Sequence, residues 1–342
     1  MTWVTLASAD VGTVTALGVG LTPMETRREV VLHLARRAEE LGYGTFSVAE
    51  AWGWDVGVLL AEVAGVTERI GLGIGVMNTW GRSAGTIAML AASLDAVSGG
   101  RFRLGLGAGS PALAEGLHDV PFDRPVEHLA AVTVQVRRLL RGERLEPTTG
   151  ARGLRLGVPP CPDVALHLAA LGPRSVRRAG ELADGWDPFF VPVSGLGRLA
   201  DGVREGAAHA GRDDRPVVCP AVPAAVADDP AVSRATAWWW VAFYLTAMGP
   251  LYPRTLRAHG LGAAVDEVVA ARPTGRTTDV PEGAEVLLDE LTIHGDATQG
   301  RAALERWRAA GAEEPAIVLP PGRPVDELDH ILEALAPQPR NN

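Results

Sequence analysis

Apolar residues and glycines alternate from Ile70 to Val76, and the alternation then gives way to polar and aromatic residues. A second stretch of this kind runs from Arg101 to Gly109, and a helical pattern from Thr86 to Ser98 separates the two. Strand, helix and strand in this order form the unit from which parallel sheets are built. Glycine at a strand end is unfavourable unless something approaches the backbone closely. Two such neighbouring strands predict a flat ligand across the mouth of a sheet.

The same alternation of strand and helix patterns continues along most of the chain. Strands are expected at 14–21, 45–49, 70–76, 101–107, 164–170, 184–188, 217–226 and 316–319, with the segment 291–295 completing the pattern. Helices are expected at 26–41, 56–67, 86–98, 124–141, 175–183, 195–210, 233–257, 298–310 and 325–335. Eight parallel strands with helices between them are typical of a (β/α)8 barrel or a doubly wound sheet, and the count favours the barrel. A barrel active site lies at the C-terminal strand ends.

Local signals refine these elements. Thr26 and Ser175 are plausible N-caps, and Gly42 is a plausible helix stop. The segment 142–162 is rich in Gly, Pro and Arg and is interpreted as an excursion, with a hairpin as one possibility. The three consecutive tryptophans 238–240 point around a helix, so they favour packing over a common functional face.

Length and charge limit the classes of protein that fit. The chain has 342 residues, which suits a single barrel domain over 1–342 with insertions. Its net charge is −9 and its basic residues are scattered, which argues against nucleic-acid binding. No apolar run approaches the roughly 20 residues of a membrane span, and the N-terminus lacks a signal-peptide pattern. Cys161 and Cys219 have no metal or redox spacing, so a reducing cytoplasm fits.

Residue content also excludes some chemistry. All 32 basic residues are arginine, so enzymes that form a Schiff base through lysine are excluded. None of the eight histidines, His167 among them, has a partner at metal-ligand spacing, so no metal site is expected and most histidines are interpreted as solvated helix residues. The glycines 105, 107 and 109 do not match a dinucleotide fingerprint.

Several stretches resemble the luciferase-like monooxygenase superfamily, including its coenzyme F420-dependent oxidoreductases. The stretch from Ser93 to Gly109 is the most specific. The others are 38–43 (AEELGY), 67–73 (TERIGLG), 171–174 (LGPR), 183–185 (ADG) and 309–312 (AAGA). The regions 243–260 and 305–319 look more like the F420 branch, with FMN as the alternative cofactor.

The resemblance implies a barrel that holds a flavin or deazaflavin at its mouth, next to a non-proline cis peptide at Gly75-Val76. It also implies backbone amides for the cofactor phosphate at the start of the helix near Ser175, although a tight turn with an N-cap would look the same. The residues expected at the cofactor are Glu50, Gly75, Val76, Met77, Asn78, Gly107, Ala108, Gly109, Leu171, Gly172, Pro173 and Ser175.

Glu50 and His118 are the candidate catalytic residues. Burial at the mouth would raise the pKa of Glu50 and make it a proton donor, and the alternative is a structural acid bonded to backbone amides. His118 lies with Asp119 in a long loop, which can equally be a solvated loop. The substrate pocket is expected to include Trp52, Trp54, Trp80 and Ser110, and the alternative for these aromatic residues is a loop core.

The leading hypothesis is a coenzyme F420-dependent reductase that adds hydride to an activated C=C, C=N or C=O bond of an apolar, peptide or secondary-metabolite substrate. Enzymes of the sugar-phosphate type carry an acid–histidine pair and a glutamate where this chain has Glu50-Ala51 and Ser110, so sugar-phosphate oxidation is not expected. The alternatives are an FMN-dependent monooxygenase and a non-catalytic flavin-binding subunit. The resemblance also implies a homodimer.

Overall fold

Ten parallel strands form one sheet in the computed structural model, which describes residues 17–271 and 279–338. Along the sheet the order is β7-β6-β5-β4-β3-β2-β1-β10-β8-β9. The strands are β1 (Gly18–Leu21), β2 (Thr45–Val48), β3 (Gly71–Asn78), β4 (Phe102–Gly107), β5 (Ala165–Leu168), β6 (Gly185–Trp186), β7 (Val217–Val218), β8 (Ala221–Val226), β9 (Ile293–Gly295) and β10 (Ala316–Leu319).

The sheet closes into the expected barrel through a single segment of the chain. The expected strand 217–226 is divided into β7 and β8 at Cys219-Pro220, because proline has no N–H to donate to the ladder. β7 pairs with β6 and β8 pairs with β10, so this segment joins the two ends of the sheet. β9 is an additional strand, which pairs with the end of β8. The eight expected barrel positions are therefore confirmed, and the expected residues 14–16 lie outside the described part.

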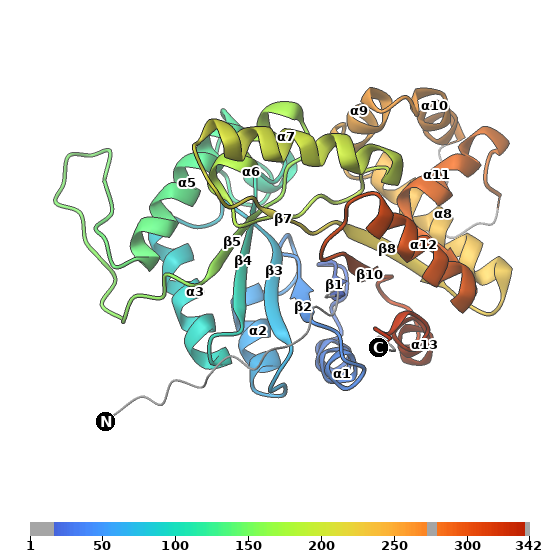
Figure 1. The fold of residues 1–342 in the computed structure, drawn as a ribbon, viewed down its shortest axis with the longest axis horizontal. Coiled ribbons are helices and arrows are strands. Elements are labelled where there is room, and N and C mark those ends of the chain that lie inside the picture. The colour runs from blue at the N-terminus through green and yellow to red at the C-terminus, as the bar shows by residue number, and fades with distance from the viewer. Residues whose placement is uncertain (1–16, 272–278, 339–342) are drawn as a thin grey trace.

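Helices surround the barrel, and α8 to α11 gather at one side of it (Figure 1). The helices are α1 (Arg28–Glu40), α2 (Val56–Ala64), α3 (Ala84–Ser98), α4 (Pro111–Ala114), α5 (Pro125–Leu140), α6 (Pro173–Leu182), α7 (Leu196–His209), α8 (Pro230–Thr246), α9 (Leu251–Ala258), α10 (Gly262–Ala271), α11 (Glu285–Leu291), α12 (Ala297–Ala309) and α13 (Val325–Leu335). Within the described ranges, none of them is long and apolar enough to cross a membrane.

Two hydrophobic cores hold this arrangement together. The larger one lies between the outer faces of the strands and the surrounding helices, and includes Val31, Phe46 and Leu104. The smaller one lies under α8 to α11. Trp238 and Trp240 are fully buried there, so the expectation that these tryptophans pack is confirmed.

Two local expectations, both N-caps, were wrong. The N-cap of α1 is Arg27 and not the expected Thr26. The Arg27 side chain makes no capping hydrogen bond. α6 begins at Pro173 with Gly172 as N-cap, because the fixed φ of proline favours the first helical position. Ser175 lies inside the first turn, where its hydroxyl donates to the Gly172 carbonyl. The segment 142–162 projects from the body as a loop between α5 and β5, as the expected excursion (Figure 1), and it contains no strand. Gly42, at φ +83°, follows the end of α1 as expected.

Candidate active site at the mouth of the barrel

Glycines on β4 make room for a side chain from β3. A Cβ on Gly105 would lie 2.2 Å from the Ile74 carbonyl oxygen and 2.9 Å from Val76 Cγ1, and one on Gly107 would lie 2.7 Å from Val76 Cγ2. Only glycine at both positions lets the Val76 side chain lie across β4. Gly105 and Gly107 therefore leave a flat surface beside Val76 at the C-terminal end of these strands, which we call the glycine floor.

β3 is irregular at its end. The Gly75-Val76 peptide bond is cis, as expected, and the pairing register with β4 shifts between Ile74 and Met77. The Glu50 N–H donates to the Val76 carbonyl over 3.1 Å, which ties this bulge to the end of β2. The Met77 side chain is fully buried in the larger core, so only its backbone can face the mouth.

Glu50 stands in a network of charges beside this bulge. Its side chain is 7% exposed, and its Oε2 accepts a 2.5 Å hydrogen bond from Arg82. Arg82 also pairs with Asp55, which caps the start of α2. Glu50 Oε1 is buried, with no hydrogen-bond partner among the described residues. Burial raises the pKa of Glu50 above the ordinary glutamate value, and the nearby Arg82 opposes this rise.

His118 lies on the same side of the mouth as Glu50. Its Nε2 is 3.4 Å from the Asn78 side-chain nitrogen, and its ring lies so close to Gly81 that a Cβ there would be 2.5 Å away. Asn78 in turn accepts from the backbone N–H groups of Trp80 and Gly81. When charged, His118 lowers the pKa of Glu50. The two expected catalytic residues are thus close enough to interact.

The four expected substrate residues occupy different surroundings. Trp80 is 9% exposed, stacks on His128 with ring centroids 3.9 Å apart, and donates to the Ala108 carbonyl over 2.7 Å. It therefore joins the ends of β3 and β4. Trp52 and Trp54 are 50% and 57% exposed on the loop after β2. Ser110 accepts from the Leu113 N–H as the N-cap of α4. Their roles toward a substrate stay predictions.

The expected phosphate site is the start of α6. Gly172 is its N-cap and Pro173 its first residue, so the free backbone N–H groups begin at Arg174. Leu171 and Ser175 are half-buried beside it. The positive end of a helix dipole favours an anion, and the phosphate site that the resemblance implies here stays a prediction.

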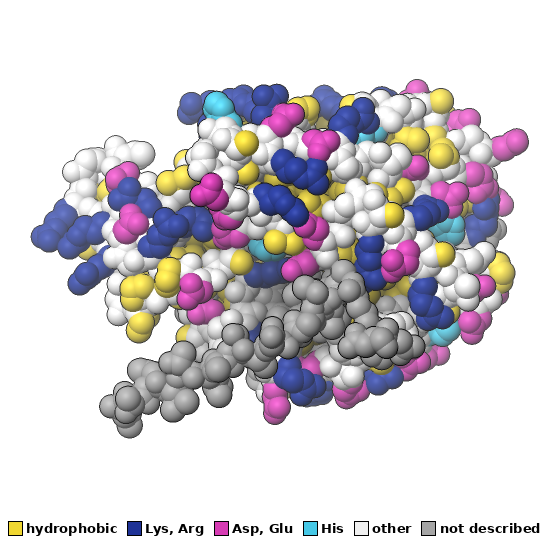
Figure 2. Space-filling model, viewed as in Figure 1, with side chains coloured by type: hydrophobic (Ala, Val, Ile, Leu, Met, Phe, Trp, Pro, Cys, Tyr) yellow, Lys and Arg dark blue, Asp and Glu magenta, His cyan; other side chains and the backbone are white. Residues whose placement is uncertain are grey.

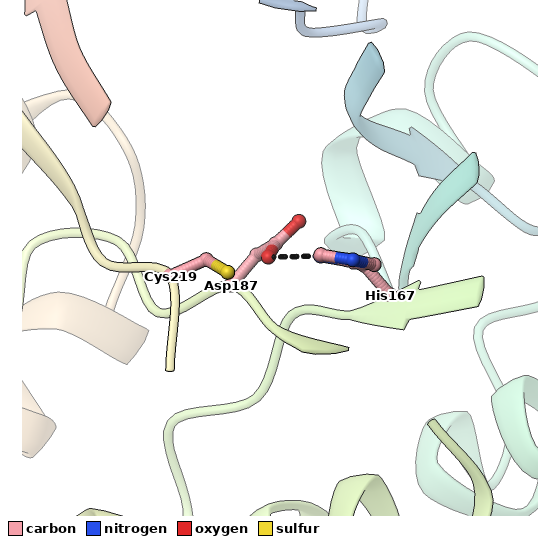
Figure 3. A group of neighbouring side chains, drawn as sticks. All are labelled: His167, Asp187 and Cys219. Carbon is pink, nitrogen blue, oxygen red and sulfur yellow. Dashed lines mark hydrogen bonds and ion pairs between the residues drawn. The ribbon is translucent and has the colours of Figure 1, made fainter. Parts of the chain in front are cut away.

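Sequence reasoning missed Arg82 and a group inside the barrel that contains His167, Asp187 and Cys219 (Figure 3). His167 Nδ1 lies 2.7 Å from Asp187 Oδ1. His167 is buried on β5, within the strand expected at 164–170. The signal was present, because His167 lies in the middle of an apolar strand pattern. Burial raises the pKa of the Cys219 thiol well above its usual value.

The sequence pattern of the luciferase-like monooxygenase family matches residues 8–314, most of the chain. The chain belongs to the luciferase-like monooxygenase family. It is 32% identical over 320 residues to a protein of Mycobacterium tuberculosis that carries the provisional name coenzyme F420-dependent oxidoreductase. This alignment covers 85% of the chain and 90% of that protein.

Solved structures of low sequence identity share the fold. The coenzyme F420-dependent tetrahydromethanopterin reductase of Methanopyrus kandleri superposes with a TM-score of 0.74 at 21% identity, over 93% of this chain and 97% of that one. The oxygenating constituent of 3,6-diketocamphane monooxygenase of Pseudomonas putida, solved with FMN, gives a TM-score of 0.67 at 16% identity, over 94% and 98%. Both cofactor types therefore occur on this fold.

Proposed function

We propose that this luciferase-family protein is a coenzyme F420-dependent oxidoreductase that reduces an activated C=C, C=N or C=O bond. The observation that carries the choice of cofactor is the relative with an F420-dependent name, which aligns over 85% of the chain. The glycine floor beside Val76 supports a flat tricyclic ring at the mouth. When bound, F420 would supply the hydride, and the protein would supply binding, orientation and a proton.

Residues at four strand ends would hold the cofactor. The ring would lie against Val76 and the backbone of Gly75, Met77 and Asn78, with Gly107, Ala108 and Gly109 beside it. The buried Glu50 Oε1 needs a donor, and a polar edge of the ring would provide one. The phosphate would take the free N–H groups at the start of α6, next to Leu171, Gly172, Pro173 and Ser175.

Glu50 and His118 are the groups that we assign to proton handling. A hydride added to a carbonyl carbon leaves an electron pair on oxygen, which must be protonated. Glu50 suits this role because burial raises its pKa and so favours the protonated carboxyl, the form that donates a proton. His118 would protonate Glu50 or the substrate from the loop side.

The substrate that we propose is a fairly apolar small molecule or peptide. The exposed indoles of Trp52 and Trp54, next to the mouth, support it, because large exposed apolar side chains often mark binding surfaces. Positive and negative side chains are interspersed over the face seen in Figure 2, which gives no support to a nucleic-acid partner.

Titration of the purified protein with oxidised F420 and with FMN tests the cofactor, with intrinsic tryptophan fluorescence as the signal. We expect F420 to bind at least tenfold more tightly, and the Trp80→Phe variant to lose part of the quenching. Tighter binding of FMN would overturn the proposal in favour of an oxygenase, the second candidate, which the FMN-bound neighbour supports. F420 binding without reduction of any tested substrate would favour a non-catalytic binding subunit.

A homodimer in the cytoplasm completes the proposal. Val58 on α2 and Met89 and Val97 on α3 are between 58% and 65% exposed, and these two helices pack side by side. A second copy of the chain would cover this apolar surface. Cys161 and Cys219 are both free, which suits a reducing compartment.

A further inference from the structure

Three side chains that bind metals well meet inside the barrel. They are His167 of β5, Asp187 directly after β6, and Cys219 directly after β7. One imidazole nitrogen, one carboxylate oxygen and the Cys219 sulfur all lie within 4.8 Å of one another. Figure 3 shows the three side chains converging, with the Asp187 carboxylate between the other two.

The backbone ladder fixes this convergence. The Asp187 N–H donates to the Leu168 carbonyl over 3.0 Å, and the Cys219 N–H donates to the Trp186 carbonyl over 2.9 Å. These two hydrogen bonds hold Asp187 beside the end of β5 and Cys219 beside the end of β6. Adjacent strands are about 4.8 Å apart in any sheet. Residues that follow one another around a barrel at similar height point toward the same interior volume.

Glycines leave the interior volume open for this group. A Cβ on Gly185 would lie 2.2 Å from His167 Cε1, so the imidazole lies flat against the backbone of β6. A Cβ on Gly105 would lie 3.3 Å from Asp187 Oδ2 and 2.9 Å from Val76 Cγ1. The carboxylate of Asp187 therefore lies near the floor of the mouth.

We propose that His167, Asp187 and Cys219 bind one divalent transition-metal ion, with Zn²⁺ as the best match to this donor set. Nitrogen, sulfur and oxygen donors together suit Zn²⁺, whereas Mg²⁺ and Ca²⁺ take oxygen ligands. Donors around tetrahedral zinc are about 3.5 Å apart, so shifts of about 1 Å would seat the ion. Three protein ligands leave a fourth position for water or substrate, which is the arrangement of catalytic zinc sites.

The charges of the group favour a cation. A carboxylate inside a barrel is unfavourable unless it is paired, and the His167 imidazole is its hydrogen-bond partner here. A divalent ion would pair with the carboxylate and with the thiolate that forms when the metal displaces the thiol proton. Placed near Val76, such an ion would lie close to the proposed hydride-transfer site and could polarise a substrate carbonyl.

Cobalt binding to the whole chain tests the site without a substrate or F420. The purified protein is stripped with a chelator and titrated with Co²⁺, which reports a sulfur ligand by a near-ultraviolet charge-transfer band. We expect one Co²⁺ per chain, loss of the band in Cys219→Ser, and at least a tenfold weaker affinity in Asp187→Asn and His167→Gln. Zn²⁺ should then displace Co²⁺.

Matched controls separate this site from general metal binding. Cys161→Ser removes the other thiol, and His33→Gln removes a histidine that pairs with Asp329 on the outer helices. Both should bind Co²⁺ like the original protein. Circular dichroism identifies any variant that fails to fold. If Cys219→Ser or His167→Gln does not fold, the Co²⁺ affinity of Asp187→Asn decides, because this substitution keeps the shape of the side chain.

No Co²⁺ binding at micromolar concentrations, or a band that survives Cys219→Ser, would overturn the metal site. The F420 titration, repeated on the chelator-stripped protein, follows cofactor binding without any metal and is therefore independent of both results. Failure of one proposal can therefore be told from failure of the other.

Discussion

At the scale of single residues, the mouth is organised by one guanidinium between two carboxylates. Arg82 holds Glu50 on one side and Asp55 on the other, and Asp55 also caps α2. Arginine suits this place because its planar fork presents several donors at once. The ion pair between Arg82 and Glu50 keeps the Glu50 side chain at a fixed position beside the β3 bulge. It leaves Glu50 Oε1 without a hydrogen-bond partner among the described residues.

The raised pKa of Glu50 makes a pH-dependent prediction. The folded protein holds this proton more tightly than the unfolded chain, so Glu50 lowers the free energy of unfolding as pH rises above its ordinary value of 4.5. The Glu50→Gln variant has no ionisable carboxyl at this position, so it lacks this pH-dependent contribution to the free energy of unfolding. Urea unfolding between pH 4.5 and 7 should therefore show the variant gaining stability relative to the original protein as pH rises. The partly exposed Glu62→Gln is the control, and parallel curves for Glu50→Gln would contradict the assignment.

At the scale of elements, a glutamate on α1 explains why two of the resemblance stretches belong together. Glu39 accepts hydrogen bonds from the backbone N–H groups of Glu68, Arg69 and Ile70, at 3.0, 2.6 and 2.8 Å. These residues lead into β3, the strand that carries the bulge. Burial acts to raise the pKa of Glu39, but the three backbone donors outweigh it, and the pKa lies below the ordinary value.

Glu39→Ala should reduce the free energy of unfolding at neutral pH by about 1–3 kcal/mol, because three backbone donors lose a charged acceptor. Since its folded pKa is lowered, the contribution of Glu39 is present above pH 4.5 and is lost as pH falls through the folded value. The neighbouring Glu40→Ala removes only an exposed pair with Arg37 and should change stability by less than about 0.5 kcal/mol. Chemical denaturation at pH 7 and pH 3 measures both, and equal effects of the two variants would rule out the capping role.

Sequence patterns predicted elements best where local signals agree with burial. The strand 316–319 and the helix 325–335 match β10 and α13 residue for residue. The division of 217–226 and the start of α6 depend on single prolines, which the periodicity of apolar residues does not register. Glu50 was predicted as a site residue because it directly follows an expected strand. Asp187 and Cys219 were missed as a group because contact between successive strands is set by register and barrel closure, which sequence spacing does not contain.

At the scale of the whole molecule, the proposed cofactor site and an exposed apolar face lie on different parts of the chain. The residues proposed for the cofactor all come from one barrel, whereas the exposed face lies on α2 and α3. Met89, Ser93 and Val97 follow one another at intervals of four residues, so they share one side of α3. This separation predicts that assembly and cofactor binding can be uncoupled.

Replacing Met89 and Val97 together by glutamate should therefore turn the proposed dimer into a monomer that still binds F420 with unchanged affinity. Burying four added carboxylates between two copies is strongly unfavourable, whereas on a monomer the same carboxylates face water. Light scattering after size-exclusion chromatography gives the mass, and the fluorescence titration gives the affinity. Leu154→Glu, at a residue 74% exposed on the projecting loop, is the control and should remain dimeric. A dimer that survives the double substitution would assign the interface to another face, and a monomeric original protein would end the dimer proposal.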